Sequence, residues 1–156
     1  MVWLAVSPRG ISNPYFLPVS HGSVDGNTYL TILKKALLPF ITTAYPDGDF
    51  VFWRDLASCH YAKSVREFLV ERGIRSVEKE DNPPNCPQLR PIENFWAIWK
   101  SRVYADGWEA KNVKQLKMRM KRKLKEIDVE TVQRMMEGVQ RKLRKAKDTG
   151  VRSVLS

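Results

Sequence analysis

The sequence predicts an α/β protein in which short strands and helices alternate, followed by a purely helical C-terminal stretch. The first half holds apolar runs of four or five residues bounded by Gly, Pro, Asp and Asn, a pattern typical of strands. Between and after these runs, apolar residues recur at helical spacing. With 156 residues, 43% of them hydrophobic and 28% charged, the chain is long enough to bury a core without disulfides or structural metal.

The N-terminal segment predicts two neighbouring strands. Residues 2–6 are all apolar and are followed by the turn residues 7–10. Residues 15–19 form a second apolar run. Because the connection is short, a hairpin is the favoured arrangement.

A first helix is predicted over residues 25–38, where six apolar side chains form a broad face. Asp25 or Asn27 is the candidate N-cap. Pro39 is the expected stop, because proline cannot donate the hydrogen bond that continues a helix.

Residues 50–53 are apolar on both faces, as a central strand would be, and this strand is expected to end next to Asp55. Residues 61–72 have helical spacing, and Gly73 ends that helix. A short strand over residues 74–77 follows.

A stiff, extended connection is predicted over residues 81–91, which contain four prolines. Pro91 is suited to the first position of the next helix. That helix carries an apolar stripe of Ile92, Phe95, Trp96, Trp99 and Val103. The two tryptophans could stack on a flipped base, but at this spacing core packing is the better interpretation.

The C-terminal third predicts two amphipathic helices with apolar faces at residues 113–127 and 129–143, the second capped by Asp128. All of the net charge of +10 lies in residues 100–156, because residues 1–99 hold ten basic and ten acidic side chains. Such asymmetry suggests a polyanionic partner, although a solvated basic face is the plainer alternative. The candidate nucleic-acid contacts are Lys114, Lys117, Lys121, Arg122, Lys125, Arg141, Lys142, Arg144 and Lys145.

Several classes of protein are excluded by composition. Cys59 and Cys86 lie in no CxxC or Cys/His cluster, so neither a disulfide scaffold nor a zinc module is indicated. Buried packing of small side chains explains both cysteines. The apolar runs are far shorter than the ~20 residues that cross a bilayer, so we expect an intracellular protein without membrane contact.

Two carboxylates stand out by context: Asp55 at the end of an apolar strand, and Glu93 in the first turn of an aromatic-rich helix. Acids on separate elements suit Mg²⁺, which shares one or two protein carboxylates with phosphate oxygens. Two such ions roughly 3.5 to 4 Å apart support phosphodiester chemistry. From position alone, a cap for Asp55 and a helix-dipole carboxylate for Glu93 are the stronger alternatives.

The sequence segments around these two acids resemble motifs of the mariner-type transposases. The first matching segment, FVFWRDLASCHYAK at residues 50–63, is similar to the family's second-aspartate motif, an apolar strand ending in Asp with Ala two and His five positions on. The second, NPPNCPQLRPIENFW at residues 82–96, is similar to its final block, with a double proline, a Cys-Pro-x-Leu-x-Pro core and the last catalytic acid. The 37 residues between Asp55 and Glu93 fall within the family's range. The opening strand and residues 132–144 also resemble family elements, so the resemblance covers almost the whole chain.

The resemblance implies a ribonuclease H-like mixed sheet with flanking helices, over residues 1–104, and a basic helical extension of the same domain over residues 105–150. It implies two Mg²⁺ or Mn²⁺ ions held by three acids, which hydrolyse and rejoin DNA at transposon ends in the nucleus. Asp55 would bridge both ions and Glu93 would hold one. His60 and Asn94 would lie beside the site, with helix capping as the alternative for His60.

The chain departs from the family pattern in one important respect. The resemblance places the first catalytic Asp on a central strand before the opening segment, and no substitute is evident, because Asp25 opens a helix and Asp47 and Asp49 lie in a turn. A DNA-reading helix-turn-helix region is also expected upstream. Gln88 and Arg90 replace common family residues but are not expected to be ligands.

Two functions remain open at this point. The first is an N-terminally truncated catalytic domain of a transposase, inactive in strand transfer as this chain. The second is a catalytically dead DNA-binding or assembly module derived from a transposon. Loss of the central strand would expose two strand edges, so we expect self-association, a homodimer or pairing with an intact transposase. No small-molecule substrate is expected.

Overall fold

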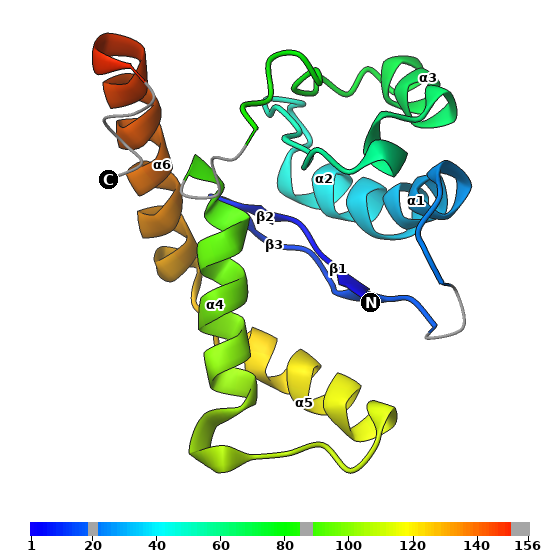
Figure 1. Ribbon diagram of the computed structural model, residues 1–156, viewed down its shortest axis with the longest axis vertical. Coiled ribbons are helices and arrows are strands. Elements are labelled where there is room, and N and C mark those ends of the chain that lie inside the picture. The colour runs from blue at the N-terminus through cyan, green and yellow to red at the C-terminus, as the bar shows by residue number, and fades with distance from the viewer. Residues whose placement is uncertain (19–21, 85–88, 151–156) are drawn as a thin grey trace. The chain divides into compact units, whose positions relative to one another are not determined.

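The computed structural model describes residues 1–18, 22–84 and 89–150, and the chain divides into two compact units (Figure 1). The first unit is built from Met1–Ala5 and Ser12–Asn85, and the second from Val6–Ile11 and Cys86–Ser156. Each unit is defined by the contacts that its residues make with one another. The functional boundary expected after residue 104 is a separate matter and stays a prediction.

The N-terminal hairpin is confirmed, as two short antiparallel ladders. They pair β1 (Val2–Trp3) with β4 (Tyr15–Phe16), and β2 (Val6–Ser7) with β3 (Gly10–Ile11). Ser12 interrupts the ribbon, because its hydroxyl accepts the Ala5 N–H at 2.8 Å while its own N–H donates to the Ala5 carbonyl at 2.9 Å. The Ser12 hydroxyl therefore takes the place of a backbone partner, and this serine is buried.

The helices of the first unit begin near the predicted positions. They are α1 (Gly26–Ile32), the π-helical turn η2 (Leu33–Leu37), α2 (Leu38–Ala44), the 3₁₀ turn η3 (Ser58–Tyr61) and α3 (Lys63–Glu71). Asp25 is the N-cap of α1, and its Oδ1 accepts the Thr28 N–H at 2.7 Å. Gly73 adopts a φ of 63° just after α3, as expected of a residue that ends a helix.

The predicted stop at Pro39 is wrong. The helical path continues from α1 through η2 into α2 and ends at Ala44, with Pro39 in the first turn of α2. In an α-helix, the proline ring clashes with the carbonyl four residues earlier. The π-helical turn just before Pro39 is wider, with i→i+5 bonds such as the one from the Leu38 N–H to the Leu33 carbonyl, so it accommodates the ring.

A continuous apolar core holds the first unit together. Its buried members are Leu17, Tyr29, Ile32, Leu33, Ala36, Leu37, Ile41, Val65, Phe68, Leu69 and Ile74. The start of α1 approaches the segment before α3 closely, because a Cβ placed on Gly26 would lie 2.6 Å from the Cβ of Ala62. Glycine is therefore needed at position 26 for packing.

The prediction of a full central strand at residues 50–53 is wrong in extent. The segment forms a single parallel bridge, Phe52 with Ser76, in which the Phe52 N–H donates to the Arg75 carbonyl at 2.8 Å. Val51 is 57% exposed, so only one side of the segment is covered. A strand is also expected at residues 74–77, and there too only this bridge, at Ser76, is formed.

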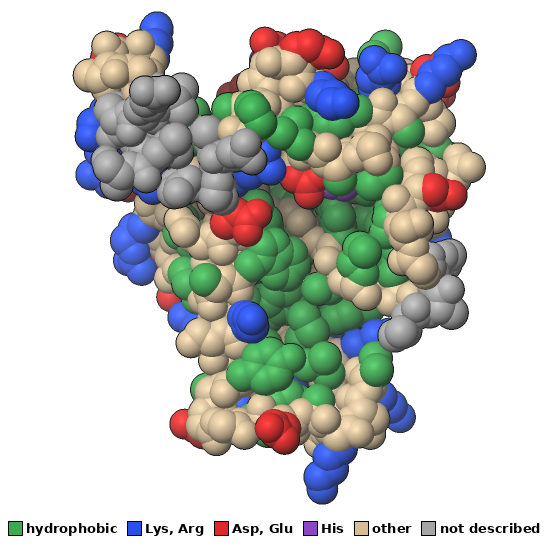
Figure 2. All heavy atoms as spheres, viewed as in Figure 1, with side chains coloured by type: hydrophobic (Ala, Val, Ile, Leu, Met, Phe, Trp, Pro, Cys, Tyr) green, Lys and Arg blue, Asp and Glu red, His purple; other side chains and the backbone are tan. Residues whose placement is uncertain are grey.

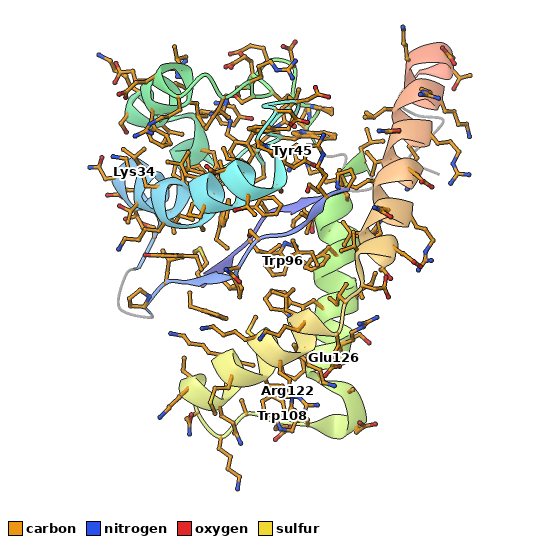
Figure 3. All side chains as sticks on the ribbon, turned by 180° about the vertical axis from the view of Figure 1, so that it is seen from behind. Lys34, Tyr45, Trp96, Trp108, Arg122 and Glu126 are labelled. Atoms are coloured by element: carbon orange, nitrogen blue, oxygen red, sulfur yellow. The ribbon has the colours of Figure 1, made fainter. Side chains whose placement is uncertain are left out.

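The second unit contains the other helices: α4 (Pro91–Val103), the 3₁₀ turn η5 (Ala105–Gly107), α5 (Val113–Lys125) and α6 (Val129–Thr149). Pro91 begins α4 as predicted, and Asp128 caps α6, with its Oδ1 accepting the Thr131 N–H at 2.6 Å. Phe95 and Trp99 of α4 are buried, which confirms core packing for Trp99, and the Trp99 indole N–H donates to the Met120 carbonyl at 3.0 Å. Trp96, half-buried, stacks on Trp99 (Figure 3).

These elements agree with the α/β class. Within the described ranges, the strands form two small antiparallel sheets and one parallel bridge, so the specific ribonuclease H-like sheet stays a proposal. Among the described helices, none is both long enough and apolar enough to cross a membrane.

Candidate acidic site and basic helical faces

Asp55 lies just beyond the Phe52–Ser76 bridge, at the start of a short loop that leads to η3. Its Oδ1 accepts the Ala57 N–H at 2.7 Å and lies 2.8 Å from His60 Nδ1. The side chain is 51% exposed, so the carboxylate is held by its loop and still open to solvent. An acid in this state is suited to bind a cation or a donor from solution.

His60 is fixed on its other side by an aromatic partner. Its ring stacks on Tyr29 of α1 with the ring centroids 3.8 Å apart, and its side chain is only 13% exposed. The capping alternative for His60 is wrong, because Ala62 is the N-cap of α3. The histidine instead connects α1 to the Asp55 carboxylate.

The charge of Asp55 acts on its neighbours. Burial raises the pKa of the Tyr29 phenol, and the Asp55 carboxylate raises it further. Burial and then Asp55 likewise raise the pKa of the Cys59 thiol. Both groups therefore stay protonated near neutral pH.

Two residues that sequence reasoning passed over hold the Asp55 loop from behind. Arg54 and Asn82 are each 2% exposed, and the Asn82 side-chain amide donates to the Arg54 carbonyl at 2.8 Å. The sequence signal for Arg54 is a charged residue at the end of an apolar run, which indicates a strand end and not a buried anchor. Asn82 lies at the start of the double-proline segment and carries no periodic signal of its own.

Glu93 and Asn94 lie in the first turn of α4, in the second unit, and both side chains are exposed. The Glu93 N–H donates to the Arg90 carbonyl at 3.2 Å, which closes the first turn. Glu93 is placed where a helix N-terminus favours negative charge. The convergence of Asp55 and Glu93 on shared ions stays a prediction.

The other acids lie where the sequence placed them. Asp25 caps α1, and Asp49 lies in the turn before residue 50, where Arg75 reaches it at 3.4 Å. In the part of the chain that is described, no group of three or more His, Cys, Asp and Glu side chains is arranged to hold a metal ion. Cys86 and Gln88 lie outside the described residues.

Two basic side chains of α5 make contacts that stabilise the second unit. Arg119 donates to the Val103 carbonyl at 2.6 Å and stacks 4.5 Å over the Trp108 ring, and Lys123 pairs with Glu126 at 2.8 Å. Trp108 and Glu126 are labelled in Figure 3. The predicted DNA-contacting residues of α5 lie on the outer side, and all but the half-buried Lys117 are exposed; they are Lys114, Lys117, Lys121, Arg122 and Lys125.

The α6 candidates lie near the C-terminal end of that helix. Arg141, Arg144 and Lys145 are exposed and Lys142 is half-buried. Figure 2 shows Lys and Arg side chains gathered along the outer sides of α5 and α6. Their contact with nucleic acid stays a prediction.

Comparison with known proteins finds a transposase that is similar to this chain. The Tc3 transposase of Caenorhabditis elegans is 30% identical to this chain over 117 residues, which is 75% of the chain. The chain is therefore transposase-like over three quarters of its length. It spans 33% of the length of the transposase that it matches. No protein-family model matches the chain.

Proposed function

We propose that this chain is part of the catalytic domain of a DNA transposase, and that Asp55 and Glu93 are two of its metal-binding acids. The observation that carries the proposal is the half-exposed Asp55 carboxylate, held by His60 and the Ala57 N–H at the end of an extended segment, in a chain related to transposases. The ribonuclease H-like sheet and action on DNA in the nucleus belong to the same proposal.

The donor atoms suit the ion. Mg²⁺ and Mn²⁺ prefer hard oxygen ligands and are usually bound by one or two carboxylates together with phosphate oxygens. Asp55 and Glu93 supply exposed carboxylates of this kind. When bound, the ions would supply an activated water or hydroxyl and stabilisation of the leaving oxygen.

The residues of the chain have distinct roles in this proposal. The Ala57 N–H orients the Asp55 carboxylate, and the His60 ring, stacked on Tyr29, lies beside it, which reduces the ordering needed when a cation binds. The helix N-terminus of α4 favours the ionised form of Glu93. The outer faces of α5 and α6 supply sequence-independent phosphate contacts to DNA.

We expect no strand transfer from the 156-residue chain alone. The family resemblance assigns three acids, and only Asp55 and Glu93 have matches in this sequence. Asp25 is occupied as a helix cap and Asp49 pairs with Arg75, so neither substitutes for the first acid.

The test is a titration of the isotope-labelled chain with Mn²⁺, followed by the paramagnetic broadening of its amide signals. We expect broadening at residues 55–60 and at Glu93. The variant Asp55→Asn removes the charge with little change of shape, and we expect it to abolish the broadening at residues 55–60. Asp49→Asn is the matched control, because it neutralises an exposed acid in the same unit.

The two parts of the proposal have separate outcomes. Equal broadening in the parent chain and in Asp55→Asn would overturn the metal-binding role of Asp55. If Asp55→Asn leaves the Glu93 signal as strongly broadened as before, the two acids do not share ions and the two-acid site is wrong.

A further inference from the structure

The loop that carries Asp55 is anchored by a buried polar network. Arg54 and Asn82 are both 2% exposed. Asn82 bonds to both ends of the loop between residues 54 and 61, and Arg54 joins His60 of that loop to Ser76. A buried polar group costs folding free energy unless it is fully hydrogen-bonded, so such a network holds its surroundings in one arrangement.

Asn82 uses both ends of its side-chain amide. Its Nδ2 donates to the Arg54 carbonyl at 2.8 Å and to the Tyr61 hydroxyl at 2.9 Å, and its Oδ1 accepts the Trp53 indole N–H at 3.0 Å. The Arg54 carbonyl belongs to the peptide group that leads directly into Asp55. One amide therefore fixes the backbone just before Asp55 and the side chain of Tyr61 at the far end of the loop.

Arg54 closes the same loop from inside. Its guanidinium donates to the His60 carbonyl at 2.8 Å and to the Ser76 hydroxyl at 3.1 Å, and it lies 4.4 Å from the centre of the Tyr61 ring. The bond to His60 joins the residue before Asp55 to the residue whose imidazole contacts the Asp55 carboxylate. Taking a guanidinium out of water is costly, and these contacts to oxygens and to the ring offset part of that cost, while the buried Arg54 Nε has no hydrogen-bond partner among the described residues.

We propose that Asn82 is a positioning residue for the Asp55 carboxylate: it acts through the Arg54 backbone and Tyr61 and does not touch a metal ion itself. The inference rests on the proposed function, since it assigns a role in cation binding at Asp55. A carboxylate whose loop is already ordered loses less conformational freedom when a cation binds, and outer partners of this kind affect metal affinity about 10- to 100-fold. The double-proline segment that follows Asn82 restricts the backbone and so keeps the amide in place.

The test compares Mn²⁺ midpoints, measured from amide broadening at residues 55–60 in the full chain, with thermal unfolding of the same proteins. Asn82→Ala removes all three bonds, and we expect its Mn²⁺ midpoint to rise about tenfold. The control is Val65→Ala, which destabilises the core of the first unit at a residue of α3 that is fully buried. We expect this control to lower the unfolding temperature while its midpoint stays at the parent value.

Two milder variants make the test independent of whether Asn82→Ala folds. Trp53→Phe keeps an aromatic ring but removes the five-membered ring with the N–H that orients the Asn82 Oδ1, and we expect an intermediate rise in the midpoint. Tyr61→Phe removes one acceptor of Asn82 but leaves its bond to the Arg54 carbonyl, so we expect a smaller rise than with Trp53→Phe.

The outcomes separate the two levels of the argument. If Asn82→Ala and Trp53→Phe share the midpoint of Val65→Ala while Asp55→Asn still abolishes the broadening, Asp55 binds the ion and the positioning role of Asn82 is overturned. If Asp55→Asn has no effect, the proposed function fails and the inference fails with it.

Discussion

The lysine row of α5 offers a quantitative test of DNA binding. Lys114, Lys117, Lys121 and Lys125 follow one another at intervals of three or four residues and so lie on one stripe of the helix. We expect their joint replacement by Gln to weaken duplex binding and to reduce its salt dependence. Glutamine keeps the length and the helix propensity of the side chain, so the change is mainly one of charge.

The magnitude follows from helix geometry and counterion release. At a rise of 1.5 Å per residue, the row extends about 16 Å, long enough to follow several phosphates of a duplex. Each phosphate contact contributes about 0.9 to the slope of log affinity against log salt concentration, so four contacts contribute about 3.6. Between 50 and 200 mM salt, a slope of about 3.6 corresponds to a loss of about 10²-fold in affinity. The variant should lack this contribution of the four lysines to the salt dependence.

The assay is a fluorescence-anisotropy titration of a duplex at several salt concentrations. A charge-matched control replaces four exposed basic residues of the first unit by Gln, namely Lys34, Lys35, Lys63 and Arg66. We expect the control to change the slope by less than about 0.9, the contribution of one phosphate contact. An equal fall in slope for both variants would refute the argument, because it would mean that net charge, and not the α5 stripe, governs binding.

Three further predictions concern packing and protonation. Gly26→Ala should lower the unfolding temperature, because its Cβ would lie 2.6 Å from a neighbouring Cβ, whereas Gly138→Ala on α6 should raise it, since a Cβ there meets open space among the described residues and alanine favours helix. A hydrogen bond from the threonine three residues later lowers the pKa of Asp128, so the stability advantage over Asp128→Ala should be full at neutral pH and should disappear as acid titrates that carboxyl; thermal unfolding across the acid range would show this, and a constant difference would contradict it. Because burial and Asp55 both raise the pKa of the Cys59 thiol, Asp55→Asn should speed its alkylation by iodoacetamide, as followed by mass spectrometry; an unchanged rate would show that Asp55 does not act on the thiol.

Local signals were sufficient for most of the helices. These signals depend on residues within a few positions of each other. They are the capping side chains Asp25 and Asp128, the proline at the start of α4 and the apolar periodicity of α4 to α6. Pro39 shows the limit of such reasoning, since the helix continues past it through a π-helical turn. The wider turn leaves Leu33 and Leu37 buried in the core of the first unit.

The sequence did not predict contacts between segments that are far apart in the chain. Residues 50–53 have strand composition, but the extent of pairing depends on the partner, and the partner is a single bridge at Ser76. The candidate site shows the same division. Its acids Asp55 and Glu93 came from motif resemblance, while Asn82, which bonds to the backbone 28 positions earlier in the chain, had no local pattern that would single it out.

The sequence by itself determined most of the helices, the hairpin, the concentration of positive charge at one end and the resemblance to transposases, because each depends on neighbouring residues or on a short motif. Only the tertiary structure decided that His60 contacts the Asp55 carboxylate and that Arg54 and Asn82 lie buried behind it. The physical reason is that burial and hydrogen-bond partners are properties of how distant segments pack, and the same polar residue is a surface group or a buried anchor according to what covers it.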